Sequence, residues 1–240
     1  MAEIQLFAGC LAQTFFPQAG EAVQLVLGRL GLKVRRINDA FCCGQMAFND
    51  GLRKEATTLA RRLLGAVDPA LPVVLPSGSC TAMIRVFYSD LLCGQPELAQ
   101  MAQRIRPQVF EFSEYLTQVL KVTDVGARFE STVAYHPSCH LTRELRVTNG
   151  PLDLLKSVRG LSLREFEKSE ECCGFGGLFS VKFPHISAAM LEDKIARVSA
   201  SGAKTLVSCD LGCLMHIGGG LHRRRLGIET RHLAEVLAGR

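Results

Sequence analysis

Ten cysteines are the residues of this sequence whose type and spacing indicate chemistry. Nine of them form two series with the same internal order. The first series is Cys10, Cys42, Cys43 and Cys80, and the second is Cys139, Cys172, Cys173, Cys209 and Cys213. Each series contains an adjacent pair followed by glycine, with flanking cysteines at matching distances. Such a coincidence is very improbable by chance, so we interpret the chain as an internal duplication.

Thiolates are soft ligands that suit iron–sulfur clusters and zinc. Structural zinc sites usually contain two short Cys-x-x-Cys segments, whereas these cysteines are far apart and two in each half are adjacent. Neighbouring thiolates do not easily reach one small ion, but a multi-iron cluster offers each of them a separate iron. Glycines follow both pairs, at Gly44 and at Gly174, Gly176 and Gly177, and would let backbone N–H groups approach the cluster sulfides. The pattern therefore favours clusters over zinc.

Two other interpretations stay open. The thiolates could hold zinc in a structural interaction module, or the vicinal pairs could cycle between dithiol and disulfide as in a reductase. Cys93 has no counterpart in the second half, and we expect it to be a packing residue. His136, His140 and His216 lie near candidate ligands. His216, three residues after Cys213, is the best ligand candidate of the three, and each could instead donate a hydrogen bond or pack.

The segments between the cysteines predict the elements that position them. Residues 4–10, 73–80, 132–139 and 206–213 are typical of short buried strands that end at a cysteine, whereas 17–30, 52–64 and 184–199 have helical periodicity. This alternation predicts an α/β fold, an internal duplication of a βαβ-type unit with a mainly parallel sheet. The cysteines would then lie at the strand and helix edge where ligands collect, and helix N-termini favour thiolate over thiol.

The repeat predicts two cysteine-rich units, residues 1–122 and 131–240, separated by a polar stretch at 123–130. At the unit ends we match residues 115–120 with 232–237. Pro76 and Met83 stand where the second half has Cys209 and His216. Because the first site has fewer candidate ligands, we expect it to hold iron less tightly than the second.

Composition limits the remaining functions. The 240 residues are 48% hydrophobic and 21% charged, with no Trp, which indicates a packed soluble protein. No apolar run approaches the roughly 18 residues of a membrane span, and no signal peptide is recognisable, so we expect a cytoplasmic protein that is not an integral membrane protein. Disulfides are disfavoured there. The net charge of +5 is scattered apart from residues 223–225, so we expect no nucleic-acid partner.

These motifs resemble the tandem cysteine-rich CCG-domain family over nearly the whole chain. The matching segments are Ala8–Cys10, Phe41–Gly44, Ser77–Cys80, His136–His140, Glu171–Gly177 and Cys209–His216. The sequence is most similar to the lactate-utilisation branch, and is related to the iron–sulfur subunit of glycolate oxidase and to the heterodisulfide reductase subunit that carries such motifs. The first half departs from the fullest pattern, because Met83 replaces the last cysteine of its final Cys-x-x-Cys.

The resemblance implies up to two iron–sulfur clusters per chain, of the [4Fe–4S] type or a non-cubane form. Carried over residue by residue, one would be held by Cys10, Cys42, Cys43 and Cys80 and the other by Cys139, Cys172, Cys173 and Cys213, with Cys209 as an additional candidate. It also implies an electron-transfer subunit of an oxidoreductase complex that converts L-lactate, or a related 2-hydroxy acid such as glycolate, with iron–sulfur partner subunits. No G-x-G-x-x-G motif follows a predicted strand, so a complete enzyme is not expected from this chain alone, and no catalytic residue is assigned.

Overall fold

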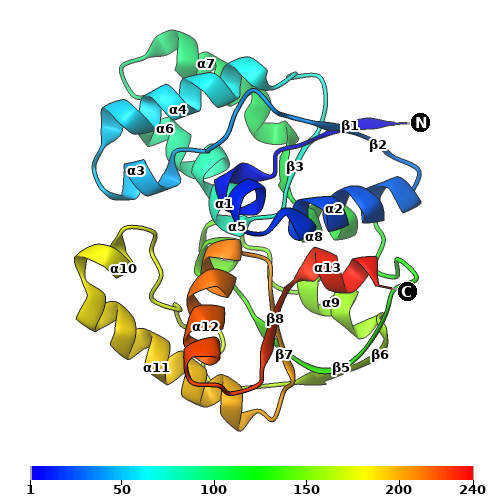
Figure 1. Ribbon diagram of the computed structural model, residues 1–240. Helices are drawn as coiled ribbons and strands as arrows, with labels where there is room; N and C mark the ends of the chain where they lie inside the picture. Colours follow the sequence, from blue (N-terminus) through cyan, green and yellow to red (C-terminus); the bar gives the residue numbers. More distant parts are fainter. Residues whose placement is uncertain (1, 240) are drawn as a thin grey trace.

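The computed structural model describes residues 2–239 and contains two four-stranded, fully parallel sheets, one in each half of the chain (Figure 1). The strand orders are β2-β1-β3-β4 and β6-β5-β7-β8. In both sheets the first strand of the half lies in the interior, next to the third. This confirms the predicted α/β class with a duplicated parallel unit.

The first sheet consists of β1 (Glu3–Leu6), β2 (Lys33–Arg36), β3 (Val73–Leu75) and β4 (Val109–Glu111). Its helical segments are α1 (Gly9–Thr14), α2 (Pro17–Arg29), α3 (Gln45–Asn49), α4 (Arg53–Ala66), α5 (Gly78–Ala82), η1 (Met83–Phe87), α6 (Tyr88–Leu91), α7 (Pro96–Ile105), η2 (Arg106–Gln108), α8 (Phe112–Glu114) and η3 (Tyr115–Val119).

The second sheet consists of β5 (Arg128–His136), β6 (Arg159–Arg164), β7 (Thr205–Ser208) and β8 (Glu229–His232). Its helical segments are η4 (His140–Glu144), α9 (Gly150–Lys156), α10 (Phe179–Lys182), α11 (Pro184–Ala200), α12 (Leu211–Arg223) and α13 (Leu233–Ala238). β5 begins inside the polar stretch that we expected to separate the units.

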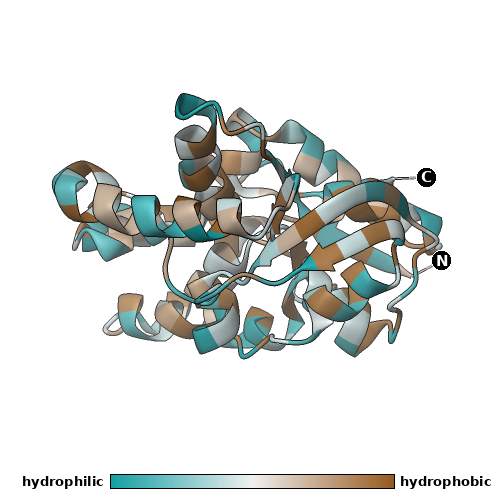
Figure 2. Ribbon diagram, turned by 90° about the horizontal axis from the view of Figure 1, so that it is seen from below, coloured by the Kyte–Doolittle hydropathy of each residue, from teal (hydrophilic) through white to brown (hydrophobic). Residues whose placement is uncertain are grey.

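The helices predicted from periodicity are present as α2, α4 and α11. Pro17 and Pro184 occupy the first turns of α2 and α11, where a missing N–H costs nothing. The helices seen in Figure 2 alternate between hydrophobic and hydrophilic residues along their length. The apolar sides of α2, α4 and α11 bury residues such as Val23, Leu63 and Val198 completely. The sheets are thereby covered, and their carboxyl-terminal edges stay available for the cysteines.

The apolar core is continuous between the two halves. One cluster of buried residues contains Ile4 and Val26 from the first half together with Val133 and Leu154 from the second. Helix α13, at the end of the chain, lies beside α2 of the first half (Figure 1). The two sheets therefore share packing that fixes how their edges face each other.

The ends of the two units correspond in a different register from the one we expected. β4 and β8 pair with β3 and β7 so that Glu111 is equivalent to His232, rather than Tyr115 to His232. Both residues are N-caps of capping boxes, with Glu114 and Glu235 at the third helical position. The predicted match was displaced by four residues, because a shift of about one helical turn superposes apolar positions almost equally well.

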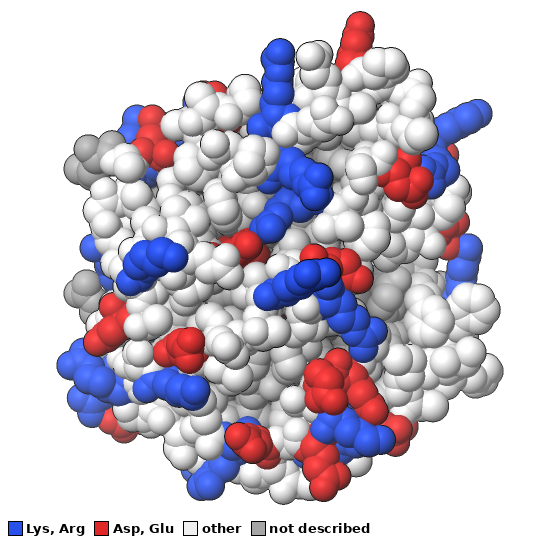
Figure 3. Space-filling model, turned by 180° about the vertical axis from the view of Figure 1, so that it is seen from behind, with Lys and Arg blue, Asp and Glu red and all other residues white. Residues whose placement is uncertain are grey.

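The surface carries no single-sign field on the face seen in Figure 3, where basic and acidic side chains are interspersed. Arg224 of the basic triplet pairs with Glu192. Within residues 2–239, the helices are all too short or too polar to cross a bilayer.

Glu111, the N-cap of α8, has a buried carboxyl group. Its Oε2 accepts hydrogen bonds from the Ser113 hydroxyl and from the N–H groups of Ser113 and Glu114, whereas its Oε1 has no partner among the described residues. Burial raises its pKa from the usual 4.5 to about 7, against the lowering effect of these hydrogen bonds. The folded protein therefore binds this proton more strongly than the unfolded chain.

We predict that Glu111→Gln removes a pH-dependent part of the stability. The contribution of Glu111 is fully present below pH 4.5 and is lost as the pH rises through about 7. The wild type should lose up to about 3 kcal/mol relative to the variant over this range. Urea unfolding at a series of pH values measures the difference, with exposed Glu97→Gln as the control. Parallel curves for wild type and Glu111→Gln would contradict the prediction.

Candidate metal centres between the two sheets

The first cysteine set is brought together by three connections at the carboxyl edge of the first sheet. Cys10 lies in α1 directly after β1, and Cys80 lies in α5 directly after β3. Cys42 and Cys43 precede α3 in a loop that turns at Gly44, whose φ of +87° favours glycine. The Sγ atoms of Cys43 and Cys80 are 3.2 Å apart, and the N–H of Gly44 points to the Cys42 sulfur at 3.4 Å.

The second set repeats this geometry. Cys139 follows β5, Cys213 lies in the first turn of α12, and the Cys172–Cys173 pair precedes Gly174, which also has φ +87°. The Sγ atoms of Cys173 and Cys213 are 3.4 Å apart, and the Gly174 N–H lies 3.4 Å from the Cys172 sulfur. The same four sequence positions in each half therefore build the same sulfur arrangement.

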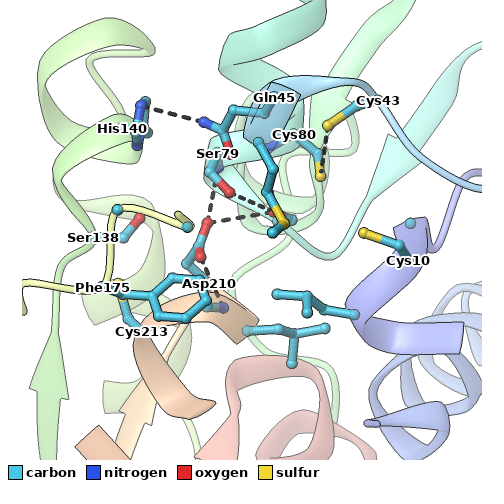
Figure 4. Close-up of a pocket in the computed structure, with 18 of the residues that line it drawn as sticks. Cys10, Cys43, Gln45, Ser79, Cys80, Ser138, His140, Phe175, Asp210 and Cys213 are labelled. Atoms are coloured by element: carbon cyan, nitrogen blue, oxygen red, sulfur yellow. Dashed lines mark hydrogen bonds between the residues drawn. The ribbon is translucent and has the colours of Figure 1, made fainter. Parts of the chain in front are cut away.

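All eight of these cysteines line one cavity between the halves, the ones that the sequence predicted: Cys10, Cys42, Cys43, Cys80, Cys139, Cys172, Cys173 and Cys213. Its volume is about 160 Å³, about ten times what one water needs. The space is thus sized for multi-atom groups. Figure 4 shows Cys10, Cys43 and Cys80 on one side of this space and Cys213 on the other.

Asp210 joins the two halves at this cavity. It caps α12 through the N–H of Gly212 at 3.1 Å, and its other oxygen accepts from the N–H of Ser79 at 2.9 Å and from the Ser77 hydroxyl at 3.3 Å (Figure 4). The beginnings of α5 and α12, which carry Cys80 and Cys213, are therefore held together by one carboxylate. Nothing in the cysteine pattern pointed to Asp210, although an aspartate before a helix is a common N-cap.

One thiol in each half is the strongest acid, and in the second half a hydrogen bond from Cys173 also lowers the pKa of Cys213, to about 7. Hydrogen bonds from Cys10 and Cys43, with that from the Gly44 N–H, lower the pKa of Cys42 to about 3 despite burial. The equivalent bonds from Cys139, Cys173 and Gly174 lower the pKa of Cys172 to about 2.

Their neighbours behave in the opposite way. Hydrogen bonding to Cys42 raises the pKa of Cys43, as bonding to Cys172 does for Cys173, and burial and the charge of adjacent thiolates add to it. The thiols therefore cannot all ionise unless a cation compensates their charge.

This donor set fits a metal or cluster. Four sulfur atoms converge in each half, all ten cysteines are free thiols, and backbone N–H groups face sulfur. Soft ligands of this kind are those of iron–sulfur clusters and zinc. A bound cationic centre would allow all four thiols to ionise, because metal ligation requires thiolate.

The remaining candidates lie elsewhere. Cys209 is fully buried in the core between the sheets, 3.6 Å from the Tyr135 hydroxyl, and does not line the cavity. Cys93 is exposed on the surface, so the expectation that it is a packing residue was wrong. Its hydrophobic neighbours misled the prediction: it follows Leu91 and Leu92, which are buried at the end of α6, and lies in the turn beyond them. His216 lies near the second set, and its Nε2 is 3.2 Å from the Ser187 hydroxyl.

The surroundings of the two sets differ. Gly44 approaches Ala56 of α4 as Gly174 approaches Ser187 of α11, which makes Leu63 the equivalent of Lys194. Lys194 is 1% exposed, and its Nζ donates to the carbonyls of Lys168 at 2.9 Å and Ser169 at 3.1 Å.

Sequence reasoning missed Lys194, since a lysine in an amphipathic helix usually faces solvent. The aligned apolar Leu63 was a signal that this position is buried.

The fold and the two sulfur sets define a class of protein: an α/β protein of two cysteine-rich units that direct their thiols to one shared cavity. The cysteine-rich domain model named CCG matches residues 4–85 and 133–218. The chain belongs to this CCG family and contains two copies of the domain.

Full-length relatives agree with this assignment. Lactate utilization protein A of Shouchella clausii is 42% identical to this chain, with 98% of both chains covered. The proteins of the same name from Bacillus pumilus and Geobacillus kaustophilus are 41% and 42% identical over 99% of this chain, and 100% and 99% of their own lengths are covered. The chain is thus a close homologue of lactate utilization protein A.

A solved structure is similar in fold. The crystal structure of a hypothetical protein from Helicobacter pylori superposes with a TM-score of 0.63 at 14% identity, covering 98% of this chain and 48% of that chain. This likeness concerns the architecture alone.

We predict that Lys194→Met loosens the segment that carries the second cysteine pair. The variant keeps the apolar stem but removes one of two donors to each carbonyl: the Lys168 carbonyl keeps the N–H of Glu171, and the Ser169 carbonyl keeps Nδ1 of His136. The lost hydrogen bonds cost about 1 kcal/mol. Amide exchange in residues 166–173 should accelerate about fivefold. Hydrogen-exchange mass spectrometry measures this, with surface Lys182→Met as the control. Equal exchange in wild type and Lys194→Met would refute an anchoring role.

Proposed function

We propose that this chain is the iron–sulfur electron-transfer subunit of a complex that oxidises L-lactate, or a related 2-hydroxy acid such as glycolate. The observation that carries the proposal is the convergence of two equivalent four-thiol sets on one cavity, in a chain about 40% identical over its full length to proteins named for lactate utilization.

The first step of the proposal is the ligand assignment. Cys10, Cys42, Cys43 and Cys80 hold one cluster, and Cys139, Cys172, Cys173 and Cys213 hold the other, each of the [4Fe–4S] type or a non-cubane form. Bound clusters supply one-electron transfer, with potentials that depend on burial and on hydrogen bonds to sulfur. The backbone N–H groups of Gly44 and Gly174 are suited to donate such bonds.

The second step concerns the partners. Lactate oxidation releases two electrons, whereas clusters accept them singly. The cavity is lined by thiols, Asp210, small or apolar residues and the neutral polar or aromatic side chains of Gln45, Asn49 and His140. Within residues 2–239 it has no lysine or arginine that could bind a carboxylate substrate. This favours substrate oxidation on another subunit, with iron–sulfur partners passing electrons through this chain. The proposed location is the cytoplasm.

We predict that each cysteine set holds its own cluster. In anaerobically purified protein, Cys80→Ser and Cys213→Ser should each lose about half of the iron and acid-labile sulfide, because each removes a ligand of one centre. Metal and sulfide analysis with site-resolved EPR measures the losses. Cys93→Ala and Cys209→Ala are matched controls and should retain both centres.

Several results would contradict this assignment. Zinc without sulfide would support the structural zinc interpretation, and metal-free protein with a reversible dithiol titration would support the reductase. Full iron in both serine variants would show that these sulfurs are not ligands.

We also predict a growth phenotype. A strain that lacks this gene should fail to grow on L-lactate but grow normally on pyruvate, since only the oxidation step is lost. The wild-type gene should restore growth and Cys173→Ser should not, although Cys93→Ala should. Growth rates on the two carbon sources measure this. Undiminished growth of the deletion strain on lactate and on glycolate would refute the metabolic role.

A further inference from the structure

We propose that His136 is a ligand of the second metal centre through its Nε2, which gives that centre a mixed nitrogen and sulfur donor set with Cys173 and Cys213. The inference rests on the proposed function, in that it takes the second cysteine set to be a metal centre. It adds a ligand of another chemical type, which the cysteine spacing does not supply.

The first observation is position. His136 ends β5, three residues before Cys139, and its side chain is 0% exposed. A ring nitrogen of His136 and the sulfurs of Cys173 and Cys213 all lie within 4.8 Å of one another. Atoms bound to one metal ion by bonds of about 2.0–2.3 Å lie at most roughly 4.5 Å apart. The three donors are therefore already close to a shared coordination sphere.

The second observation is the hydrogen-bonding state of the ring. Its Nδ1 lies 3.0 Å from the carbonyl oxygen of Ser169. A carbonyl only accepts, so Nδ1 carries the proton and donates it, and the neutral ring then has its lone pair on Nε2. This Nε2 is buried and has no partner at hydrogen-bond distance among the described residues, and the ring interacts electrostatically with the Cys213 sulfur. A ring that donates one N–H to a backbone carbonyl and presents its other nitrogen is oriented as metal-bound histidines are.

The other histidines near the cysteines are arranged differently. The Nε2 of His140 is 3.3 Å from the Gln45 side-chain nitrogen, and that of His216 is 3.2 Å from the Ser187 hydroxyl, so both already have polar partners. His232 also has an unpartnered Nε2, but within residues 2–239 no ligand group of three gathers around it. His136 is thus distinguished by an unpartnered nitrogen that lies among thiols.

The third observation is the comparison of the two halves. The strand register places Leu6 opposite Val74 and Tyr135 opposite Val207, so that Phe7 occupies the position of His136 in the first half. Phe7 is fully buried and packs in the apolar cluster that contains Cys43. The first centre therefore has no nitrogen donor at this position, and the two centres differ in their chemistry despite equivalent cysteines.

The duplication provides a matched set of variants. His136→Phe introduces the residue type that the first half has at this position, Phe7. His216→Met likewise introduces the residue type of the first half, where Met83 is the equivalent. His136→Gln preserves a side-chain N–H for the Ser169 carbonyl and guards against a folding defect in the phenylalanine variant. Protein labelled with ¹⁵N-histidine is purified anaerobically, analysed for iron, sulfide and zinc, reduced, and examined by pulsed EPR.

We expect a strong ¹⁵N hyperfine coupling from a directly bonded nitrogen in the wild type and in His216→Met. It should be absent from His136→Phe and His136→Gln. If iron and sulfide are present but the wild type shows only the weak coupling of a hydrogen-bonded ring, or if His216→Met removes the signal, the inference is overturned and the proposed function stands.

If the protein contains zinc without sulfide, the proposed function fails, and X-ray absorption at the zinc edge decides the ligand. One nitrogen that is replaced in His136→Phe supports the inference, and unchanged ligation in that variant overturns it. Protein that binds neither metal overturns both proposals.

Discussion

The rest of this structure depends on the crowding of sulfur. In each half, four thiols lie close enough to share hydrogen bonds, with pairs of sulfur atoms 3.2 and 3.4 Å apart. Thiolates at such distances repel one another, and burial increases the cost of every charge. A protein can keep this arrangement only if the backbone fixes the sulfurs and a cation compensates them. The turns that carry these cysteines fix the positions of the sulfur atoms. The donor set is suited to a bound cationic centre that would compensate their charge.

Parallel sheets explain how distant cysteines reach one place. The connections that follow β1 and β3, and those that follow β5 and β7, all leave the same edge of their sheets. The left-handed glycines Gly44 and Gly174 then turn the loops so that N–H groups face sulfur. Two copies of this unit face each other, and Asp210 accepts a hydrogen bond from the first turn of a helix in each, from Ser79 of α5 and from Gly212 of α12. The shared cavity is thus a product of the duplication and of the packing between the copies.

The two copies have kept their sulfur geometry and changed its surroundings. Cys43 and Cys80 of the first set pack in one cluster with Phe7, Leu63 and Met83, which are all buried and apolar. The positions equivalent to these carry His136, Lys194 and His216 in the second half. A buried ammonium and imidazole nitrogens interact with negative charge, whereas a phenyl ring and leucine only lower the local dielectric. Two centres with the same cysteines would therefore differ in charge balance.

The sequence by itself determined the duplication, the class of fold and the eight thiols that line the cavity, because repeats, helical periodicity and Cys-Cys-Gly turns are local patterns. It did not determine the register at the end of each unit, where a four-residue shift preserves the apolar pattern, nor that Cys93 is exposed beside two buried leucines. Only the tertiary structure decided that both cysteine sets open into one cavity, that Cys209 is directed into the core, and that His136 presents a free nitrogen to sulfur. Those properties arise from contacts between residues that are distant in the chain, such as His136 with Ser169 and Asp210 with Ser79, and no local pattern encodes such contacts.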